Sequence, residues 1–581
     1  MKRFLFILLI AVACKNPELK KEESFPTPFE KSNGNQTPEY REIIDFYIEL
    51  AREFPEINIQ TMGTTDSGNP LHIVTFNADG AFNFAKLRER NAIVLINNGI
   101  HPGESDGIDA TMQLFRDLAI QKIKPPRRTV IVTIPVYNIG GALDRNSYTR
   151  ANQNGPEEYG FRGNARNYDL NRDFIKSDTR NAFSFAEIFH LVQPDFFIDN
   201  HVSNGADYQY TLTHLFTQHN KLGGKMGTYL NNNLMPELTD SLAAKNWGVT
   251  PYVNVHNKVP ESGFSKFMDH ARYSTGYTAL WNTFGMMVET HMLKPYKKRV
   301  KGTYELMKSV IAITEKNRDT IKKLKEEAVK ASMASSFYPT AWKVDSTQVS
   351  YLNFKGYEAD TIVSEVTGYP RLSYDRSRPF TKKIPYYNHF KAGKHITVPE
   401  SYIVPAGWYE VRKRMEANAV EFTEITKDTS LIAEVYYIES YKTFPYPYEG
   451  HYGHYNTQVT TVKDRVFLCK GDIVVPTAQP AMRYIMEALE PETTDSFFNW
   501  NFFDTVLQQK EGYSAYVFED TASEMLAKDS LLRKEFELKK AEDPVFAETP
   551  RAQLQWLFKK SVHYEKKHNR YPIYRIPKKK L

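Results

Sequence analysis

Short apolar runs and helical patterns alternate along the first half of the chain. The apolar runs are rich in β-branched and aromatic residues, and they cover Ala92–Ile96, Thr129–Ile134, Phe196–Asp199 and Phe284–Glu289. Runs of this length that are apolar throughout are typical of strands buried on both faces. Between and after them, Gly107–Ala119 and Ser309–Ala331 have helical spacing. The pattern predicts an α/β domain over residues 37–335, with a mostly parallel or mixed sheet and helices on both faces.

The pattern changes after Ser336. Alternating, period-2 stretches predict strands, and they lie at Trp342–Phe354, Tyr357–Val366, Leu431–Tyr441, Gln458–Phe467 and Asp472–Val475. Helical spacing returns at Met482–Leu489 and at Ala522–Ala541. We therefore expect residues 340–581 to form a β-rich accessory domain with a helical tail, of unknown role.

The N-terminus has the pattern of an export signal. A basic start is followed by the apolar run Phe4–Ala13, which is too short to cross a bilayer but suits a signal peptide over residues 1–13. Ala11–Cys14 resembles the bacterial lipoprotein cleavage box, with Ala11 where leucine is usual, and an ordinary secreted protein cut near Ala13 is the alternative. Residues 14–36 are polar and predict a flexible tether. We expect a lipid on Cys14, a membrane-surface location, and a periplasmic or surface-exposed lipoprotein of the cell envelope.

Composition excludes several classes of protein. Of 581 residues, 41% are hydrophobic and 25% are charged, which is globular rather than disordered or multi-spanning. The 75 Lys and Arg against 69 Asp and Glu give a formal charge of +6, small for this length, so no nucleic-acid partner is expected. Cys469 is the only cysteine besides Cys14, so no intramolecular disulfide can form once Cys14 is lipidated.

Candidate metal ligands follow two of the predicted strands. His101 and Glu104, three residues apart, come in a turn after Ala92–Ile96, and His201 follows Phe196–Asp199. Sites in α/β folds form at the carboxyl ends of strands. Hydrolytic zinc sites use three protein ligands and leave one position for water. Asp199 or a backbone carbonyl is expected to hold the second ring nitrogen of His201.

Two further segments offer groups that bind a carboxylate or exchange a proton. Asn171 and Arg172 together offer an amide and a guanidinium fork, which can bind a carboxylate. Glu289 ends the apolar run Phe284–Glu289, where partial burial raises a carboxyl pKa toward the range of a general base.

In this order, the four segments resemble the zinc carboxypeptidase family, the carboxypeptidase A-like metallopeptidases. The resemblance covers about residues 38–330 and rests on His101-Pro102-Gly103-Glu104, Asp169-Leu170-Asn171-Arg172, Ile198-Asp199-Asn200-His201 and Val288-Glu289. It implies one zinc ion bound by His101, Glu104 and His201. It also implies that Asn171 and Arg172 clamp the substrate's terminal carboxylate and that Glu289 is the general base.

The chain departs from the family pattern at several positions. The family's Asn-Pro-Asp-Gly turn is Asn138-Ile139-Gly140-Gly141 here. For the arginine that polarises the scissile carbonyl, Arg162 fits best, with Arg150 and Arg145 as alternatives and Arg150 also a candidate for substrate binding. For the tyrosine that closes over the substrate, Tyr273 and Tyr277 are both candidates.

The resemblance implies a zinc-dependent metallocarboxypeptidase. Such an enzyme hydrolyses the C-terminal peptide bond of a peptide or protein substrate by attack of a zinc-activated water. Two alternatives remain open. One is an amidase or peptidase of the same scaffold that acts on cell-wall peptides, and the other is a non-catalytic lipoprotein that binds peptide or glycan.

Overall fold

The computed structural model describes residues 25–578, which divide into two compact units. Unit 1 comprises the described residues up to Ile396, together with Arg414–Val420 and Ala478–Tyr484. Unit 2 comprises Thr397–Lys413, Glu421–Thr477 and the described residues from Ile485 onward. The expected signal peptide and Cys14 lie outside the described residues.

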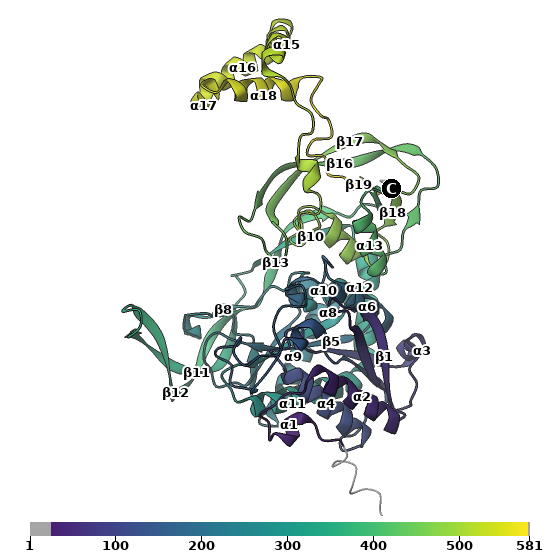
Figure 1. Cartoon of the computed structure of the whole chain (residues 1–581), viewed down its shortest axis with the longest axis vertical. Coiled ribbons are helices and arrows are strands. Elements are labelled where there is room, and N and C mark those ends of the chain that lie inside the picture. Colours follow the sequence, from purple (N-terminus) through teal and green to yellow (C-terminus); the bar gives the residue numbers. More distant parts are fainter. Residues whose placement is uncertain (1–24, 579–581) are drawn as a thin grey trace, which may run out of the picture. The chain divides into compact units, whose positions relative to one another are not determined.

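Unit 1 is built on an eight-stranded mixed sheet (Figure 1). Its strand order is β1-β2-β4-β3-β5-β9-β6-β7, and the strands are β1 (Ile57–Thr64), β2 (Pro70–Phe76), β3 (Ala92–Asn97), β4 (Thr129–Ile134), β5 (Phe196–Ser203), β6 (Leu212–Phe216), β7 (Val249–Pro251) and β9 (Phe284–His291). The four apolar runs are β3, β4, β5 and β9, which form the parallel centre of this sheet. This confirms the predicted mixed sheet and the assignment of its central strands.

Helices cover both faces of the sheet because alternate side chains of its strands point to opposite sides. Val94 and Ile198 share one apolar cluster with α2 (Tyr40–Glu53), α4 (Asp106–Ala119) and α11 (Tyr296–Lys316). On the other face, the ring of Phe197 packs edge-on against Phe185 of α6 (Arg180–Val192), with 6.0 Å between centroids.

The predicted long helix over Ser309–Ala331 is two helices. α11 ends at Lys316 and α12 spans Arg318–Met333. Asn317 between them has φ −101° and ψ 14°, which breaks the helical hydrogen bonding. The side-chain amide of Asn317 donates to Glu237 Oε2 at 2.8 Å, and this bond fixes the junction of the two helices against another part of unit 1.

The residues from Phe25 to Gln36 are folded, although the sequence predicts a tether there. They include α1 (Pro28–Lys31), which Thr27 and Glu30 cap reciprocally. Phe29 is buried, and Arg116 binds the carboxylate of Glu30 at 2.5 Å. Burial and capping therefore place the described part of the predicted tether in unit 1.

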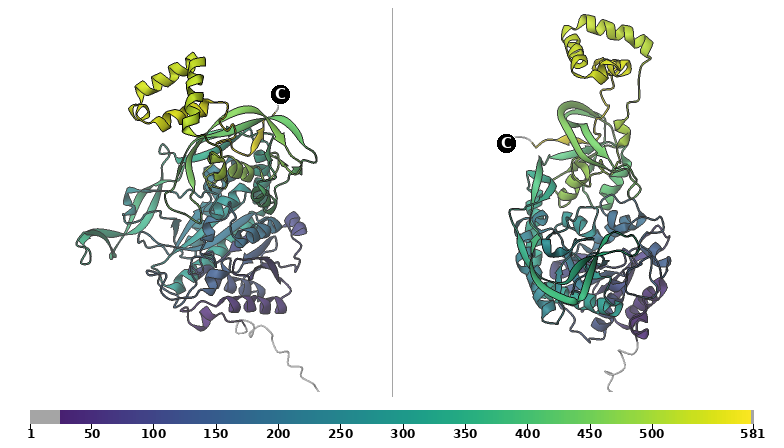
Figure 2. Two further views of the ribbon diagram at one scale, coloured as in Figure 1. Left: turned by 45° about the horizontal axis from the view of Figure 1, so that its top comes forward. Right: turned by 90° about the vertical axis from the view of Figure 1, so that its left-hand side faces the viewer.

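The first unit also extends past the predicted boundary near residues 335–340. β10 (Phe337–Val344) pairs with β13 (Phe390–Thr397), and β11 (Ser350–Val363) forms a hairpin with β12 (Pro370–Tyr387). β12 in turn pairs in parallel with β8 (Phe264–Ser265). The base of the hairpin joins an apolar cluster with residues 206–264, while its far end extends away from the main sheet (Figures 1 and 2).

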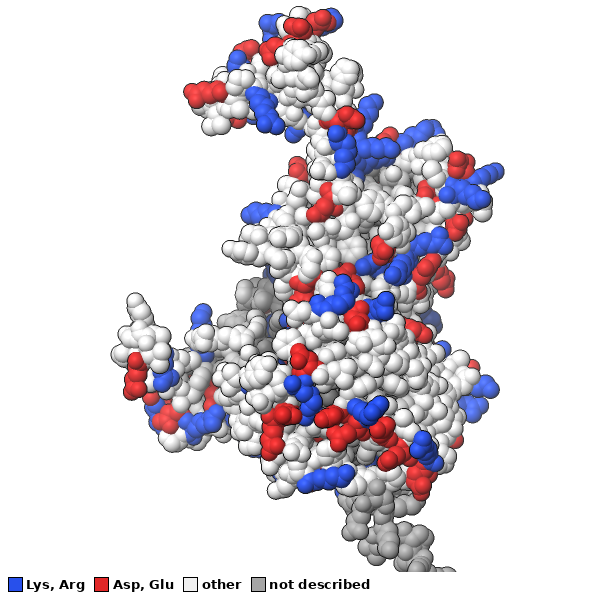
Figure 3. Space-filling view, viewed as in Figure 1, with Lys and Arg blue, Asp and Glu red and all other residues white. Residues whose placement is uncertain are grey.

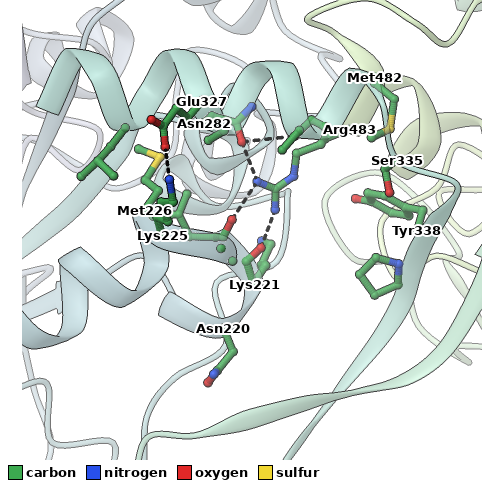
Figure 4. Close-up of a pocket in the computed structure, with 18 of the residues that line it drawn as sticks. Asn220, Lys221, Lys225, Met226, Asn282, Glu327, Ser335, Tyr338, Met482 and Arg483 are labelled. Carbon is green, nitrogen blue, oxygen red and sulfur yellow. Dashed lines mark hydrogen bonds and ion pairs between the residues drawn. The ribbon is translucent and has the colours of Figure 1, made fainter. Parts of the chain in front are cut away.

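A short segment from late in the chain, Ala478–Tyr484, completes unit 1. The Arg483 guanidinium donates to Lys221 O at 2.5 Å and to Asn282 Oδ1 at 3.1 Å (Figure 4). The three bonded residues line one side of a cavity of about 580 Å³. Lys225 and Glu327, which form an ion pair, also line this cavity. Because its guanidinium makes these hydrogen bonds, Arg483 stabilises the packing of the segment Ala478–Tyr484 against the rest of unit 1.

Unit 2 confirms the β-rich prediction. Its sheet has the order β15-β18-β14-β19-β16-β17, with β14 (Ser401–Val404), β15 (Thr423–Glu424), β16 (Thr429–Thr443), β17 (His454–Leu468), β18 (Ile473–Pro476) and β19 (Tyr574–Ile576). One predicted helix is α14 (Met482–Leu489), of which Met482–Tyr484 belongs to unit 1 and the remainder to unit 2. The others form a group that packs around its own apolar core, made of α15 (Ala515–Lys528), α16 (Ser530–Glu542), α17 (Pro544–Ala547) and α18 (Pro550–Lys560). After this group the chain returns to the sheet as β19.

The charged side chains are mixed in sign. On the face drawn in Figure 3, Lys and Arg alternate with Asp and Glu, and no large patch of one sign is visible there. Across the described residues, no helix combines the length and the apolar character that crossing a membrane requires.

Candidate metal centre and active site

Three buried side chains converge at the carboxyl ends of neighbouring strands β3 and β5. His101 Nδ1 lies 3.3 Å from Glu104 Oε1, and His201 Nδ1 lies 3.2 Å from Glu104 Oε2. One ligand atom from each residue falls within 4.8 Å of the others. The structure therefore brings together the three residues that the sequence nominated as metal ligands.

A carboxylate holds the outer nitrogen of each histidine ring. Asp169 Oδ1 lies 2.9 Å from His101 Nε2, and Asp199 Oδ2 lies 2.9 Å from His201 Nε2. Such carboxylate contacts fix the ring and leave its other nitrogen for a metal. The role expected for Asp199 agrees with this geometry, whereas the pairing of Asp169 with His101 was not predicted.

The donor set fits a divalent cation such as zinc. His101 Nδ1 is buried and has no hydrogen-bond partner among residues 25–578. Burial raises the pKa of Glu104, but the charges of Arg150 and His101 hold it well below the usual value, so the carboxylate is ionised. Two imidazole nitrogens and one carboxylate are a usual ligand set of hydrolytic zinc.

These ligands face a cavity of about 430 Å³ within unit 1, and Glu289 lines the same cavity. β5 and β9 are parallel, with His201 opposite Glu289 in register. Burial raises the pKa of Glu289 to about 7, against the lowering effect of His201. A carboxyl group with this pKa is suited to exchange protons near neutral pH.

Asn171 and Arg172 also line the cavity, on a single turn of 3-10 helix (Leu170–Arg172). Asp169 caps this turn by accepting from Asn171 N at 2.9 Å, so one side chain orients both His101 and the turn. The Arg172 guanidinium carbon lies 4.7 Å from the centroid of the Tyr273 ring. The Asn-Arg pair therefore faces the same space as the metal ligands.

Two of the three candidate arginines lie at the site, and the third does not. Arg150 and Arg162 line the cavity, with Arg150 Nη1 2.9 Å and Arg162 Nη1 3.6 Å from Glu104 Oε1. Arg145 instead donates to Pro38 O at 3.1 Å and Thr37 O at 3.2 Å. Arg145 therefore supports the N-terminal segment and does not belong to the site.

Of the two candidate tyrosines, one lines the cavity and the other lies in the core. Tyr273 lines the cavity just before α10 (Ser274–Leu280). Tyr277 lies one turn into that helix, buried among aromatic rings of unit 1, and its hydroxyl donates to Asn418 Oδ1 at 2.6 Å. The candidacy of Tyr277 for closing over the substrate is therefore corrected, because the first turn of α10 directs its ring into the core.

Several side chains that line the cavity were not predicted from the sequence, among them Tyr252, His256 and Phe267. Burial, followed by the charge of Glu289, raises the pKa of Tyr252 above its usual value, so its hydroxyl stays protonated. All three lie on loops between β7 and α10. These loop positions carry no strand or helix periodicity that would mark them in the sequence.

Comparison with known proteins gives a partial match. Residues 43–191 match the family model of zinc carboxypeptidases, a range that contains His101 and Glu104 but ends before His201. No curated protein matches the chain. Among solved structures, a metallo-carboxypeptidase from Burkholderia cenocepacia shows 15% identity and a TM-score of 0.34, covering 47% of this chain and 68% of its own. Carboxypeptidase A from Helicoverpa armigera shows 14% identity and a TM-score of 0.37, and the match covers 49% of this chain and 75% of the carboxypeptidase chain.

The family match and the ligand geometry agree. The matched segment carries the first two ligands, and β5 supplies the third at a distance that lets all three share one ion. Together they support the assignment of this chain as a hydrolase of the metallopeptidase class, with a domain of the zinc carboxypeptidase type.

Proposed function

We propose that the chain is a zinc-dependent metallocarboxypeptidase that removes the C-terminal residue of a peptide or protein substrate. One observation carries this proposal. The predicted ligands, the Asn171–Arg172 pair and Glu289 all line one cavity of about 430 Å³. The site thus has an ion-binding end, a carboxylate-binding pair and a proton acceptor.

Arg172 and Asn171 would bind the substrate's terminal carboxylate. A guanidinium fork donates two parallel charge-assisted hydrogen bonds to a carboxylate, and an amide adds a third. The ring of Tyr273 under Arg172 limits where the guanidinium can lie. Fixing the carboxylate in this way converts binding energy into alignment of the scissile bond.

Glu289 would accept the proton of the attacking water and pass it to the leaving amine. His101, Glu104 and His201 would bind one zinc ion, which polarises a carbonyl and lowers the pKa of water when bound. Asp169 and Asp199 would keep both imidazole rings in the orientation that ligation needs.

Arg162 would stabilise negative charge on the scissile carbonyl oxygen. Its Nε and Nη2 bind Asp169 Oδ2 at 3.0 and 2.8 Å, and the side chain remains 45% exposed. Arg150 donates through Nη1 to Glu104 and through Nε to Gln153, so it has less freedom to meet a substrate. Removing one such donor typically costs about 3–4 kcal/mol of transition-state stabilisation.

The test compares peptides with a free and an amidated C-terminus, analysed by mass spectrometry beside zinc measurement on the purified protein. We expect one zinc per chain, stepwise loss of C-terminal residues from the free peptide, and little loss from the amide. An Arg172→Met variant should lose the preference for the free carboxylate. Internal cleavage only, or release only from muropeptides, would reject the carboxypeptidase and favour an endopeptidase or a cell-wall peptidase.

We further propose that the mature chain is held at a membrane surface by a lipid on Cys14. Support comes from the signal-like residues 1–13 and the small residues before the cysteine. Labelling with a radioactive fatty acid should mark the chain, and a Cys14→Ser variant should lose the label and leave the membrane fraction. An unlabelled chain cut after Ala13 would show ordinary secretion instead.

A further inference from the structure

A second cavity of about 520 Å³ lies on the opposite face of β6 from the catalytic cavity. Leu215 lines the catalytic cavity, whereas His214 and Phe216 line the second one. Alternate side chains of a strand point to opposite faces, so β6 separates the two spaces. The remaining walls come from α9 (Met235–Ala243) and from the base of the β11–β12 hairpin, all within unit 1.

Several buried polar atoms in this cavity lack partners. His214 Nδ1, both ring nitrogens of His219 and Asn388 Oδ1 have no hydrogen bond among residues 25–578. The three side chains are only 6%, 6% and 8% exposed, and all of them line the cavity. Buried side-chain polar atoms are normally satisfied, so these four atoms around one cavity are available to hydrogen-bond water or a bound molecule.

A buried cation lies among them. Lys266 lines the cavity, is 5% exposed and donates from Nζ to Thr217 O at 3.0 Å. Within the described part of the chain, no carboxylate comes within ion-pair distance of this ammonium group. The neighbouring Asp269 accepts from Gln218 N at 3.2 Å, and its charge only partly offsets the effect of burial on the Lys266 pKa. Buried charges are normally paired, because an unpaired one loses its hydration without compensation.

The two imidazoles can serve as donors without carrying charge. Burial, together with the charge of Lys266, lowers the pKa of His214 and of His219 to about 3. Burial also lowers the pKa of Lys266 to about 8, which leaves the amine mostly charged at neutral pH. A neutral imidazole offers one N–H donor and one acceptor. The buried part of the site therefore presents one positive charge and additional N–H donors, while the one carboxylate among the lining residues, that of Asp240, is exposed to solvent.

The rest of the cavity is largely apolar. Tyr210, Phe216, Met235, Leu352 and Tyr386 contribute rings and aliphatic atoms to its walls. Its volume falls in the range of pockets that bind small organic molecules. We propose that this second cavity binds a small organic carboxylate with an apolar body. The carboxylate pairs with Lys266 and the imidazole N–H groups, and the body packs against the rings. This inference does not depend on the proposed peptidase activity.

Isothermal titration calorimetry with 4-phenylbutyrate tests the proposal. The full chain should carry Arg172→Met, so that the Asn171–Arg172 pair does not compete for the probe. We expect one bound molecule per chain. Acetate, which lacks the body, and 4-phenylbutanol, which lacks the charge, should each bind at least about tenfold more weakly, as the loss of a charge-assisted hydrogen bond or of apolar contact predicts.

Two variants locate the probe. Lys266→Met should weaken binding about tenfold or more, whereas Lys258→Met, at an exposed lysine of the same region, should leave the affinity unchanged. His219→Leu removes two unpartnered nitrogens, so this variant should melt at the same or a higher temperature and bind the probe more weakly. The proposal is wrong if millimolar 4-phenylbutyrate does not bind, if acetate binds equally well, or if Lys266→Met and His219→Leu both retain full affinity.

Discussion

Glu289 lies opposite His201 in the register of the parallel strands β5 and β9. Side chains opposite each other on neighbouring strands point to the same face of the sheet. The carboxylate nominated as the base is therefore held next to a nominated metal ligand by backbone hydrogen bonding rather than by a flexible loop. Burial at this position raises the pKa of Glu289 to about 7.

Replacing Glu289 by glutamine should abolish most turnover and leave the metal site intact. The substitution keeps the size of the side chain but removes its ability to accept a proton. General bases contribute about 10²–10⁴-fold to rate, so kcat on a C-terminal peptide should fall by that factor. Elemental analysis should find the same zinc content as in the unaltered chain. Near-normal turnover would remove Glu289 from the mechanism.

Asp169→Asn and Asp199→Asn should each weaken zinc binding by about 10–100-fold, because each carboxylate orients the ring of a ligand. Zinc affinity is measured by competition with a chromophoric chelator. Asp144→Asn, at an exposed aspartate of the same unit, is the matched control and should not change the affinity. If both variants bind zinc as tightly as this control, the aspartates do not support the ligands.

The central strands of the fold could be predicted because each one is marked by a short apolar run of consecutive residues. Four apolar runs became the parallel strands of the sheet, and the ligands directly follow two of them. The pairing of Asp169 with His101 could not be predicted, because it spans 68 residues and depends on how a polar loop folds over the sheet. The same holds for Tyr252 and His256, which reach the cavity from loops without a periodic pattern.

Arg162 and Arg150 should differ in what their loss affects. Arg162→Ala should lower kcat about 10²–10³-fold with zinc retained, because its guanidinium, although bound to Asp169, lines the cavity and is 45% exposed where negative charge would develop. Arg150→Ala should mainly weaken zinc binding, because Arg150 donates to the ligand Glu104 at 2.9 Å. Steady-state kinetics at saturating zinc, together with zinc titration, separates the two effects. The reverse pattern would make Arg150 the arginine that polarises the carbonyl.

Tyr273→Phe and Tyr277→Phe form a matched pair. Tyr277→Phe removes a buried hydrogen bond to Asn418 and should lower the free energy of unfolding by about 1 kcal/mol without changing kcat/KM. Tyr273→Phe should lower kcat/KM while the melting temperature stays the same, because the substitution removes the hydroxyl of a residue that lines the cavity. A loss of activity in Tyr277→Phe at unchanged stability would contradict the placement of Tyr277 in the core.

Asp109 should make unfolding depend on pH in the direction opposite to most carboxylates. It is fully buried, and burial raises its pKa to about 7, although its carboxylate accepts a hydrogen bond from Thr37 Oγ1 at 2.6 Å. In the unfolded chain the pKa of an aspartate is about 3.9. Between these values the folded state holds a proton that the unfolded state releases, so this residue's contribution to stability falls as pH rises from about 4 to about 7.

The Asp109 contribution is the difference in pH slope between the unaltered chain and Asp109→Asn, measured by urea unfolding across this range. The free energy of unfolding of the unaltered chain should fall relative to the variant by at most about 1.4 kcal/mol per pH unit. Asp144→Asn, at an exposed aspartate of the same unit, is the control and should keep the slope of the unaltered chain. Parallel slopes for Asp109→Asn and the unaltered chain would mean that Asp109 is already ionised in the folded state at acidic pH.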